Sequence, residues 1–346
     1  MAIITLTPQQ QKSHNDNFDV ISVPVEVIKS QFLAADLKES VRLREEAKKQ
    51  PFKAEIVWRN VLFFVLLHLG AFVGLCQLIT FSVKWATIGW CVFLWYISGA
   101  GITAGAHRLW SHKAYKARFP LRFLLVIMNC VAFQNDVIEW SRDHRCHHKW
   151  TDTDADPHNI NRGFFFAHMG WLLLKKHPQV KAKGSTLDLS DLTSDPLLAF
   201  QRKFYLPLVL LFCFLLPVFI PVLLWHESAS VAFYTASLFR YTFTLHSTWL
   251  INSVAHIVGY RPYDVSISST ESVWTTVLAG GEGGHNYHHT FPQDYRTSEM
   301  RTLFNMTKSF IDFFQRIGWA YDLRTVSEES IERQKAKQFD KIRKMK

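Results

Sequence analysis

Cysteine is scarce and scattered in this sequence, which excludes two classes of protein. None of the five cysteines forms a Cys-x-x-Cys pair, and three of them lie in long apolar runs. An odd, dispersed set indicates neither a disulfide framework nor a thiolate metal site. We interpret Cys146, which lies among histidines, as a small spacer.

Several cofactor and nucleic-acid signatures are also absent. The net charge is +10, yet no zinc-finger spacing and no basic helix with interleaved aromatics occurs, so we expect no nucleic acid partner. There is no glycine-rich dinucleotide fingerprint and no His-Pro-Gly-Gly haem motif, so we expect neither a fused flavin domain nor a fused cytochrome b5 domain. Residues 1–50 are polar and charged, and we expect no signal peptide there.

Long uncharged runs, in contrast, alternate with charged segments. The first run has 21 residues and would extend about 31 Å as a helix, enough to cross a bilayer. Pro207, Pro217 and Pro221 should kink the third run, which membrane helices tolerate. The pattern predicts an all-α integral membrane protein with four transmembrane helices. They are expected at about residues 61–81, 85–106, 204–225 and 230–256.

The remaining segments suggest one domain with two tails. Residues 1–50 are expected to form a mobile N-terminal tail with a possible surface helix at Val25–Lys49. Residues 51–323 form the domain, and residues 324–346 a charged C-terminal tail. The apolar stretch Leu121–Phe133 is too short to cross a bilayer, so we expect a helix lying on the membrane surface.

Charge asymmetry predicts the orientation. Lys84 lies in a turn on the far side, and Arg240 lies inside the fourth run; every other Lys and Arg lies on one side. The positive-inside rule makes that side cytosolic. Both termini and all the histidine clusters below then face the cytosol. The fourth run also carries His246, Asn252 and His256, and polar groups at such depth usually face a protein interior or cavity.

Three short histidine clusters are the main chemical signal. Histidines at i, i+3 and i+4 share one helical face, so their imidazoles can converge on an ion. His107 and His112 are five residues apart, about 140° around an ideal α-helix, and diverge unless the helix ends between them. With His256, nine imidazoles are available, which is too many for one ion and fits two ions plus water. Ligand type leaves Fe, Cu, Ni and Zn open. The other clusters are His144, His147 and His148, and His285, His288 and His289.

We expect the other histidines not to be ligands. His68, His226 and His246 lie within or between the apolar runs without cluster partners. His158 is a candidate neighbour of a ligand. Metal-bound imidazoles need a partner for the second ring nitrogen. The carboxylates near enough in sequence to supply it are Asp143, Asp152, Asp154, Asp156 and Glu282.

These motifs resemble a known family. His107–His112, His144–His148 and His285–His289 are similar to the three histidine boxes of membrane acyl-CoA desaturases, and in particular of animal stearoyl-CoA (Δ9) desaturases. The similarity runs from about Trp58 to Leu323. It includes the stretches Gly101–His107, Phe133–Asp136, Ala155–Asn159, Gly163–Phe166 and Gly259–Asp264.

The resemblance implies a cytosolic helical cap holding a di-iron centre of two Fe(2+) above the four helices. It implies the nine histidines above as ligands, Asn252 as a ligand through water, and no further catalytic side chain. Asn60, Asn135, Arg142, Asp143, Lys175, Lys176 and Trp249 would bind the acyl-CoA.

The implied reaction is O2-dependent insertion of a cis double bond at Δ9 of C16 or C18 acyl-CoA. Electrons would come from cytochrome b5 and its reductase at the endoplasmic reticulum membrane. We expect the acyl tunnel to end near Trp95–Ala100. Cys146 and Gly284 depart from common family residues, and Gly284 could widen the pocket beside His285.

Two other functions use similar residues. A hydroxylase or alkane-monooxygenase-like enzyme would use the same histidine chemistry, but the long motifs favour a desaturase. A histidine-rich zinc transporter would place histidines along a path across the membrane, whereas these nine lie at the cytosolic side.

Overall fold

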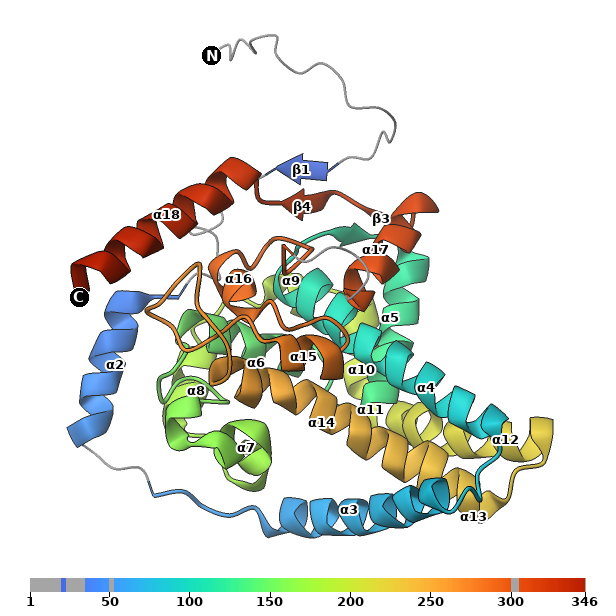
Figure 1. The fold of residues 1–346 in the computed structure, drawn as a ribbon. Helices are drawn as coiled ribbons and strands as arrows, with labels where there is room; N and C mark the ends of the chain where they lie inside the picture. The colour runs from blue at the N-terminus through green and yellow to red at the C-terminus, as the bar shows by residue number, and fades with distance from the viewer. Residues whose placement is uncertain (1–19, 23–34, 50–52, 300–304, 346) are drawn as a thin grey trace.

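Helices make up most of the protein, which is described by a computed structural model (Figure 1). The structure describes residues 20–22, 35–49, 53–299 and 305–345. The long apolar helices lie together on one side, and short helices gather at one end of α4 and α14 (Figure 1). These short helices include α6 (Val137–Lys149), α8 (Pro178–Gly184), α15 (Val273–Leu278) and α16 (His285–Thr290).

Among the described residues, three helices are long and apolar enough to cross a membrane. The first is α3 (Trp58–Ile79). The second is α4 (Trp85–Ala100), which continues without a break into the π-helix η1 (Gly101–Ser111). The third spans Tyr205–Trp225 and changes type along its length. It consists of α11 (Tyr205–Val209), the π-helix η4 (Leu210–Leu215) and α12 (Leu216–Trp225). The first three apolar runs therefore form helices of the predicted kind.

The outer surface of α3 is apolar. Leu62, Leu66, Leu69 and Phe72 follow one another at helical spacing, and each is about three-fifths exposed. A soluble protein rarely exposes so long an apolar stripe, because water contact with it is unfavourable. This surface fits the hydrocarbon interior of a bilayer.

The fourth apolar run is also helical, but it is more polar and more enclosed. The helix packs against α3 and α4. Arg240 is 1% exposed, and its guanidinium donates to the carbonyls of Val131 and Cys213. Because of such polar residues, the segment is not among the three helices that are apolar enough to cross a membrane. Its crossing of the membrane therefore stays a prediction. Its consecutive parts are α13 (Ala229–Val231), η5 (Ala232–Phe239), α14 (Arg240–Ser253) and η6 (Val254–His256).

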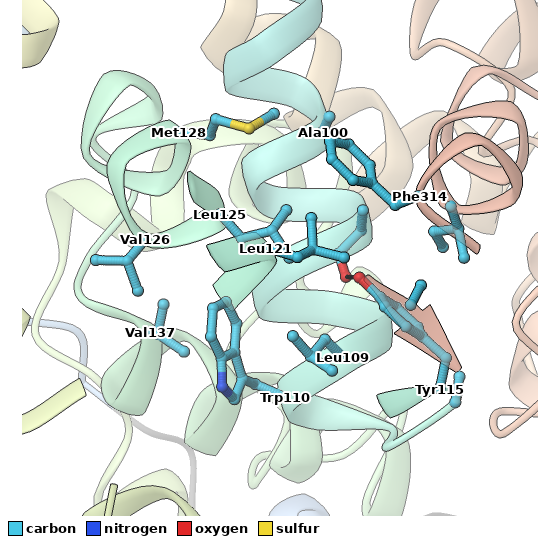
Figure 2. Packing of buried hydrophobic residues seen from close by; sticks show 14 of the residues in the cluster. Ala100, Leu109, Trp110, Tyr115, Leu121, Leu125, Val126, Met128, Val137 and Phe314 are labelled. Atoms are coloured by element: carbon cyan, nitrogen blue, oxygen red, sulfur yellow. Dashed lines mark hydrogen bonds between the residues drawn. The ribbon is translucent and has the colours of Figure 1, made fainter. Parts of the chain in front are cut away.

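The helix expected on the membrane surface packs one of its faces into the protein core. Helix α5 (Phe119–Ala132) buries Leu121 and Leu125 completely. It packs on η1 so closely that a Cβ added at Gly101 would lie 2.4 Å from the backbone of Met128. Figure 2 shows these side chains around η1. One face of α5 packs on this helix, whereas Phe119 remains largely exposed, so the position of α5 at the membrane surface stays a prediction. Helices α5 and α6, taken together, are also long and apolar enough to cross a membrane, but an 81° bend separates them.

Both expected tails contain packed structure. Helix α2 (Leu37–Lys49) buries Leu43, and Glu39 accepts a hydrogen bond from the Trp150 indole at 2.7 Å. Residues 37–49 are thus anchored rather than mobile; of the helix expected from Val25, residues 25–34 lie outside the described part. Helix α18 (Glu328–Met345) docks through Gln334, which donates to the Tyr263 carbonyl. The domain boundaries at residues 50 and 323 stay predictions.

Short strands close the fold. Strand β1 (Val20–Ser22) pairs in parallel with β4 (Leu323–Thr325), and β2 (Lys116–Ala117) pairs antiparallel with β3 (Ala320–Tyr321). The second pair joins the segment after η1 to the end of α17 (Met306–Arg316). These contacts hold the C-terminal region against the histidine-bearing helices.

Candidate metal centre and adjoining cavity

A π-helix brings the first two histidines together. In η1 the backbone bonds run from residue i+5 to residue i, and the His112 N–H donates to the His107 carbonyl at 3.1 Å. The two rings consequently lie 4.8 Å apart between centroids. The expected divergence assumed an α-helix, and the helix does not need to end between them because its turn is wider.

The other two clusters sit on short, firmly held helices. Asp136 caps α6 by accepting hydrogen bonds from the N–H groups of Ile138 and Glu139. In α16, the Asn286 side chain accepts from the Tyr263 N–H at 2.9 Å and donates to the Ser269 carbonyl at 3.0 Å. These bonds fix the direction in which each histidine face points.

All nine histidines converge, and they divide into two groups. Neighbouring Nε2 atoms lie close together: 2.8 Å for His107 and His288, 2.8 Å for His112 and His144, and 3.0 Å for His256 and His285. The second and third histidine boxes each contribute to both groups, whereas the first contributes only to one. The division therefore cannot follow from sequence order. We call them the five-histidine group (His107, His112, His144, His148, His288) and the four-histidine group (His147, His256, His285, His289).

The donor set fits two metal ions. Two nitrogens bound at right angles to an ion at about 2.1 Å would be separated by about 3 Å. The observed Nε2 separations of 2.8–3.2 Å match this value. Neutral imidazole has one N–H, so facing Nε2 atoms in groups of four or five cannot all be satisfied by one another. The rings of His148 and His289 stack at 4.1 Å, which places the groups side by side.

Two of the expected carboxylates support ligands. Asp156 Oδ1 lies 2.8 Å from His147 Nδ1. Asp152 acts through Ser268, whose hydroxyl donates to Asp152 and lies 2.7 Å from His256 Nδ1. The other three carboxylates differ. Glu282 Oε2 is 4.0 Å from His107 Nδ1, while Asp143 pairs with Arg142 and Lys176, and Asp154 with His177.

The environment keeps the ligands neutral. Burial and the neighbouring imidazoles lower the pKa of His285 to about 3, and hold the pKa values of His288 and His289 well below their usual range. Burial disfavours the charge on Asp156, but the facing His147 lowers the pKa of Asp156 below its usual value. Metal ions bind deprotonated imidazole, and these low pKa values favour that state. His147 is the exception: burial lowers its pKa, but the facing Asp156 raises it above the usual value.

A cavity of about 500 Å³ opens beside the five-histidine group. Its lining runs from Arg59 and Asn60 to His144 and Asn252. A small cavity of about 40 Å³ shares His144, Thr248 and Asn252 with it and reaches the ligands of both groups. Another of about 40 Å³ shares Thr248 and is lined by Trp95, Tyr96, Gly99 and Ala100. The shared residues show that the three cavities adjoin one another, and together they extend from the polar large cavity, past the histidines, to the expected tunnel end.

The residues expected to bind substrate line these cavities or lie beside them. Asn60, Asn135, Asp143 and Trp249 line the large cavity. Arg142 pairs with Asp143 at 2.8 Å. Lys176 also contacts Asp143, and Lys175 is exposed and pairs with Glu55 at 2.6 Å. Their roles in binding stay predictions.

Sequence reasoning missed several lining residues. Arg59, Gln134, Trp140 and Trp171 line the large cavity. Trp140 precedes His144 by one helical turn and stacks on its ring at 4.8 Å. Its place four residues before a ligand was the signal that could have identified it.

The two departures from family residues have plain explanations. A Cβ at Gly284 would lie 2.6 Å from the Ser298 side chain and 2.7 Å from the Thr297 carbonyl, so Gly284 allows a close approach and does not widen the pocket. Cys146 is buried in a separate apolar cluster with Leu43 and Trp150.

His68 and His246 have no cluster partner along the sequence, but the fold gives each of them one. Their Nε2 atoms lie 3.1 Å apart, and His246 Nδ1 lies 2.9 Å from His168 Nε2. These contacts join three elements that are distant in sequence, which a pattern search along the chain does not detect.

The chain is similar in sequence to known proteins. The sequence profile named Fatty acid desaturase matches residues 83–321. The chain is 63% identical to the Delta(9)-fatty-acid desaturase fat-5 of Caenorhabditis elegans over 308 residues, covering 89% of this chain and 92% of that protein. It is 55% identical to the stearoyl-CoA desaturase of Bos taurus and 54% identical to that of Homo sapiens. Each of these two matches extends over 279 residues and covers 81% of this chain and 77% of the other protein.

Proposed function

Because the chain belongs to the fatty acid desaturase family, we propose that it inserts a cis double bond at Δ9 of saturated C16 and C18 acyl-CoA, using O2. The observation that carries this proposal is the row of three adjoining cavities beside the histidines. It begins at polar residues such as Asn60, passes His144, and ends among Trp95 and Tyr96. A volume of about 500 Å³ lies within the roughly 300–1,000 Å³ of common ligand sites.

We propose two Fe(2+) as the resident metals, one in each histidine group. Bound iron would supply the O2-dependent oxidation that removes two hydrogens from adjacent methylenes. The five-histidine group has one ligand more than the four-histidine group. We assign Asn252, one turn before His256, to the four-histidine group as a ligand through water. Histidine ligands alone suit several metals, so the family supplies the choice of iron.

The protein's own residues bind, orient and exclude water. Cations beside the cavity mouth, Arg59, Lys175 and Lys176, suit the phosphates of CoA. Inside, Phe64 and Leu245 offer apolar walls to the acyl chain. The row of cavities fixes which methylenes lie near the ligands, and this positioning sets the site of reaction. No side chain besides the ligands is required as acid or base.

The surrounding arrangement is also proposed from family and charge. We place the enzyme in the endoplasmic reticulum membrane, with four spans and with both termini and the cap in the cytosol. Reduced cytochrome b5, kept reduced by its reductase, would deliver electrons to the basic cytosolic face. Membrane lipid surrounds the outward apolar face of α3.

Expression in a desaturase-deficient yeast tests the proposal. We expect monounsaturated C16 and C18 chains with the bond at C9, located by mass spectrometry. Alanine at His144, His147 or His289 should abolish the product, whereas His226→Asn, at an exposed turn outside the cluster, should not. Full activity in all three alanine variants would refute the ligand assignment, and products heavier by 16 mass units would indicate a hydroxylase.

A further inference from the structure

Three histidines outside the metal centre form a hydrogen-bonded chain between helices. His68 on α3 contacts the Phe64 carbonyl through Nδ1 at 2.7 Å and His246 on α14 through Nε2 at 3.1 Å. His246 contacts His168 at 2.9 Å, and His168 Nδ1 lies 2.9 Å from the Ser253 hydroxyl. His168 belongs to the π-helix η3 (Phe166–Gly170). Because His246 uses both ring nitrogens on different partners, the rings form a chain and do not converge on one ion.

Counting hydrogens shows that this chain is one proton short. Ser253 Oγ also contacts the Trp249 carbonyl at 2.8 Å, so backbone carbonyls, which only accept, end the chain on both sides. The chain therefore contains five contacts. Three neutral imidazoles and one hydroxyl supply only four hydrogens. Either one contact lacks its hydrogen, or the chain binds an additional proton and becomes cationic.

The chain of histidines packs against Trp249, a residue of the cavity wall. The Trp249 ring lies 5.0 Å from the His246 ring and 5.7 Å from the His168 ring, in both cases at an interplanar angle of 76°. Trp249 is 2% exposed and lines the large cavity. A cationic imidazole within about 6 Å of an indole is attracted to it. Added charge on the chain would therefore hold Trp249 more firmly.

We propose that His68, His246 and His168 form one shared proton-binding site that positions Trp249 in the wall of the acyl-chain cavity. The part of the proposal that concerns the acyl chain rests on the proposed function. The histidines are positioning residues, since Trp249 lies between them and the cavity. Proton binding supplies the hydrogen for the fifth contact and holds Trp249 more firmly in the cavity wall. Proton loss lets Trp249 move more freely.

Few charged groups lie around the three rings. His68 and His168 are the main charged neighbours acting on His246. Helices α7 (Trp171–Leu173) and η5, which pack on α3, carry no charged side chain. Arg240, six residues before His246, is bound to backbone carbonyls. None of the three rings forms an ion pair with a carboxylate in the described part of the chain.

Tryptophan fluorescence tests proton binding without turnover. Protonated imidazole quenches a neighbouring indole, so the signal of the purified full chain should fall as the pH is lowered from about pH 8 to about pH 4. Subtracting the fluorescence of Trp249→Phe from that of the wild type separates the signal of Trp249 from the signals of the other tryptophans. This difference signal should titrate in the wild type and in His226→Asn, and should be flat in His246→Asn.

Kinetics test the consequence for the cavity. The KM for stearoyl-CoA should be about threefold lower at the acidic end than at the basic end, the effect of roughly one cation–π contact. His246→Asn should lose this dependence with kcat little changed, whereas His226→Asn, the same substitution at an exposed site, should keep it. Ionisation of the CoA phosphates affects all proteins alike and cancels in this comparison.

Each result decides the proposal. A Trp249 signal that does not titrate in the wild type would overturn it, and this holds even if His246→Asn fails to fold. A KM that keeps its pH dependence in a folded His246→Asn protein would overturn the link to the cavity wall. An inactive wild type whose Trp249 signal still titrates would refute the proposed function but support the proton site.

Discussion

Asp156 offers the sharpest test of the metal centre. Its Oδ1 lies 2.8 Å from His147 Nδ1, and its Oδ2 accepts the Asp152 N–H at 3.1 Å. Asp156→Asn keeps the size of the side chain but removes the charge and one acceptor, so either His147 or the Asp152 N–H loses its partner. Loss of such a supporting contact typically lowers metal affinity about 10- to 100-fold. The four-histidine group should weaken by this amount, and the five-histidine group should not.

The assay loads purified protein with Fe(2+) without oxygen and equilibrates it against increasing chelator. Bound metal is then measured by mass spectrometry. The wild type should hold two ions, and Asp156→Asn should lose one of them at about 10- to 100-fold lower free chelator. Asp154→Asn is the matched control, because Asp154 lies in the same loop but pairs with His177 at 3.6 Å. Equal retention of both ions by the two variants would refute the reasoning.

Three further predictions follow from the fold. Trp95→Ala should open the expected tunnel end, so C20 products should rise relative to C18 by up to about tenfold, the value of two buried methylenes; an unchanged product profile would place the end elsewhere. Burial raises the pKa of Glu271 from 4.5 to about 7, so the folded state holds the proton more tightly and stability falls as pH rises between these values. Melting temperatures of Glu271→Gln should lose that slope, and parallel curves would contradict it. Leu121→Ala should cost about 2–5 kcal/mol of unfolding free energy because Leu121 is fully buried, whereas Leu62→Ala, on the exposed face of α3, should cost far less.

Much of the fold follows from elementary patterns. Uncharged runs of sufficient length predicted α3, α4 and the helix Tyr205–Trp225, because backbone groups in lipid must be satisfied within a helix. The packing of the short apolar stretch in α5 could not be predicted in this way. Periodicity and length show that a face is apolar, but they do not show whether lipid or protein covers it.

The histidine clusters were readable because i, i+3 and i+4 spacing has one geometric meaning. The sequence could not show that His107 and His112 meet. A π-helix differs from an α-helix only in that each backbone hydrogen bond spans five residues and not four. It could not divide the nine ligands into two groups either. Nor could it show that His68, His168 and His246 touch, because contacts between distant elements depend on how the helices pack.

The most direct test of the central claim uses purified, iron-loaded protein with stearoyl-CoA, O2 and reduced cytochrome b5. The product should weigh two mass units less than the substrate, with one cis double bond between C9 and C10, and with two irons per chain. A hydroxylated product, a bond at another position, or no O2-dependent product from fully iron-loaded protein would contradict the account.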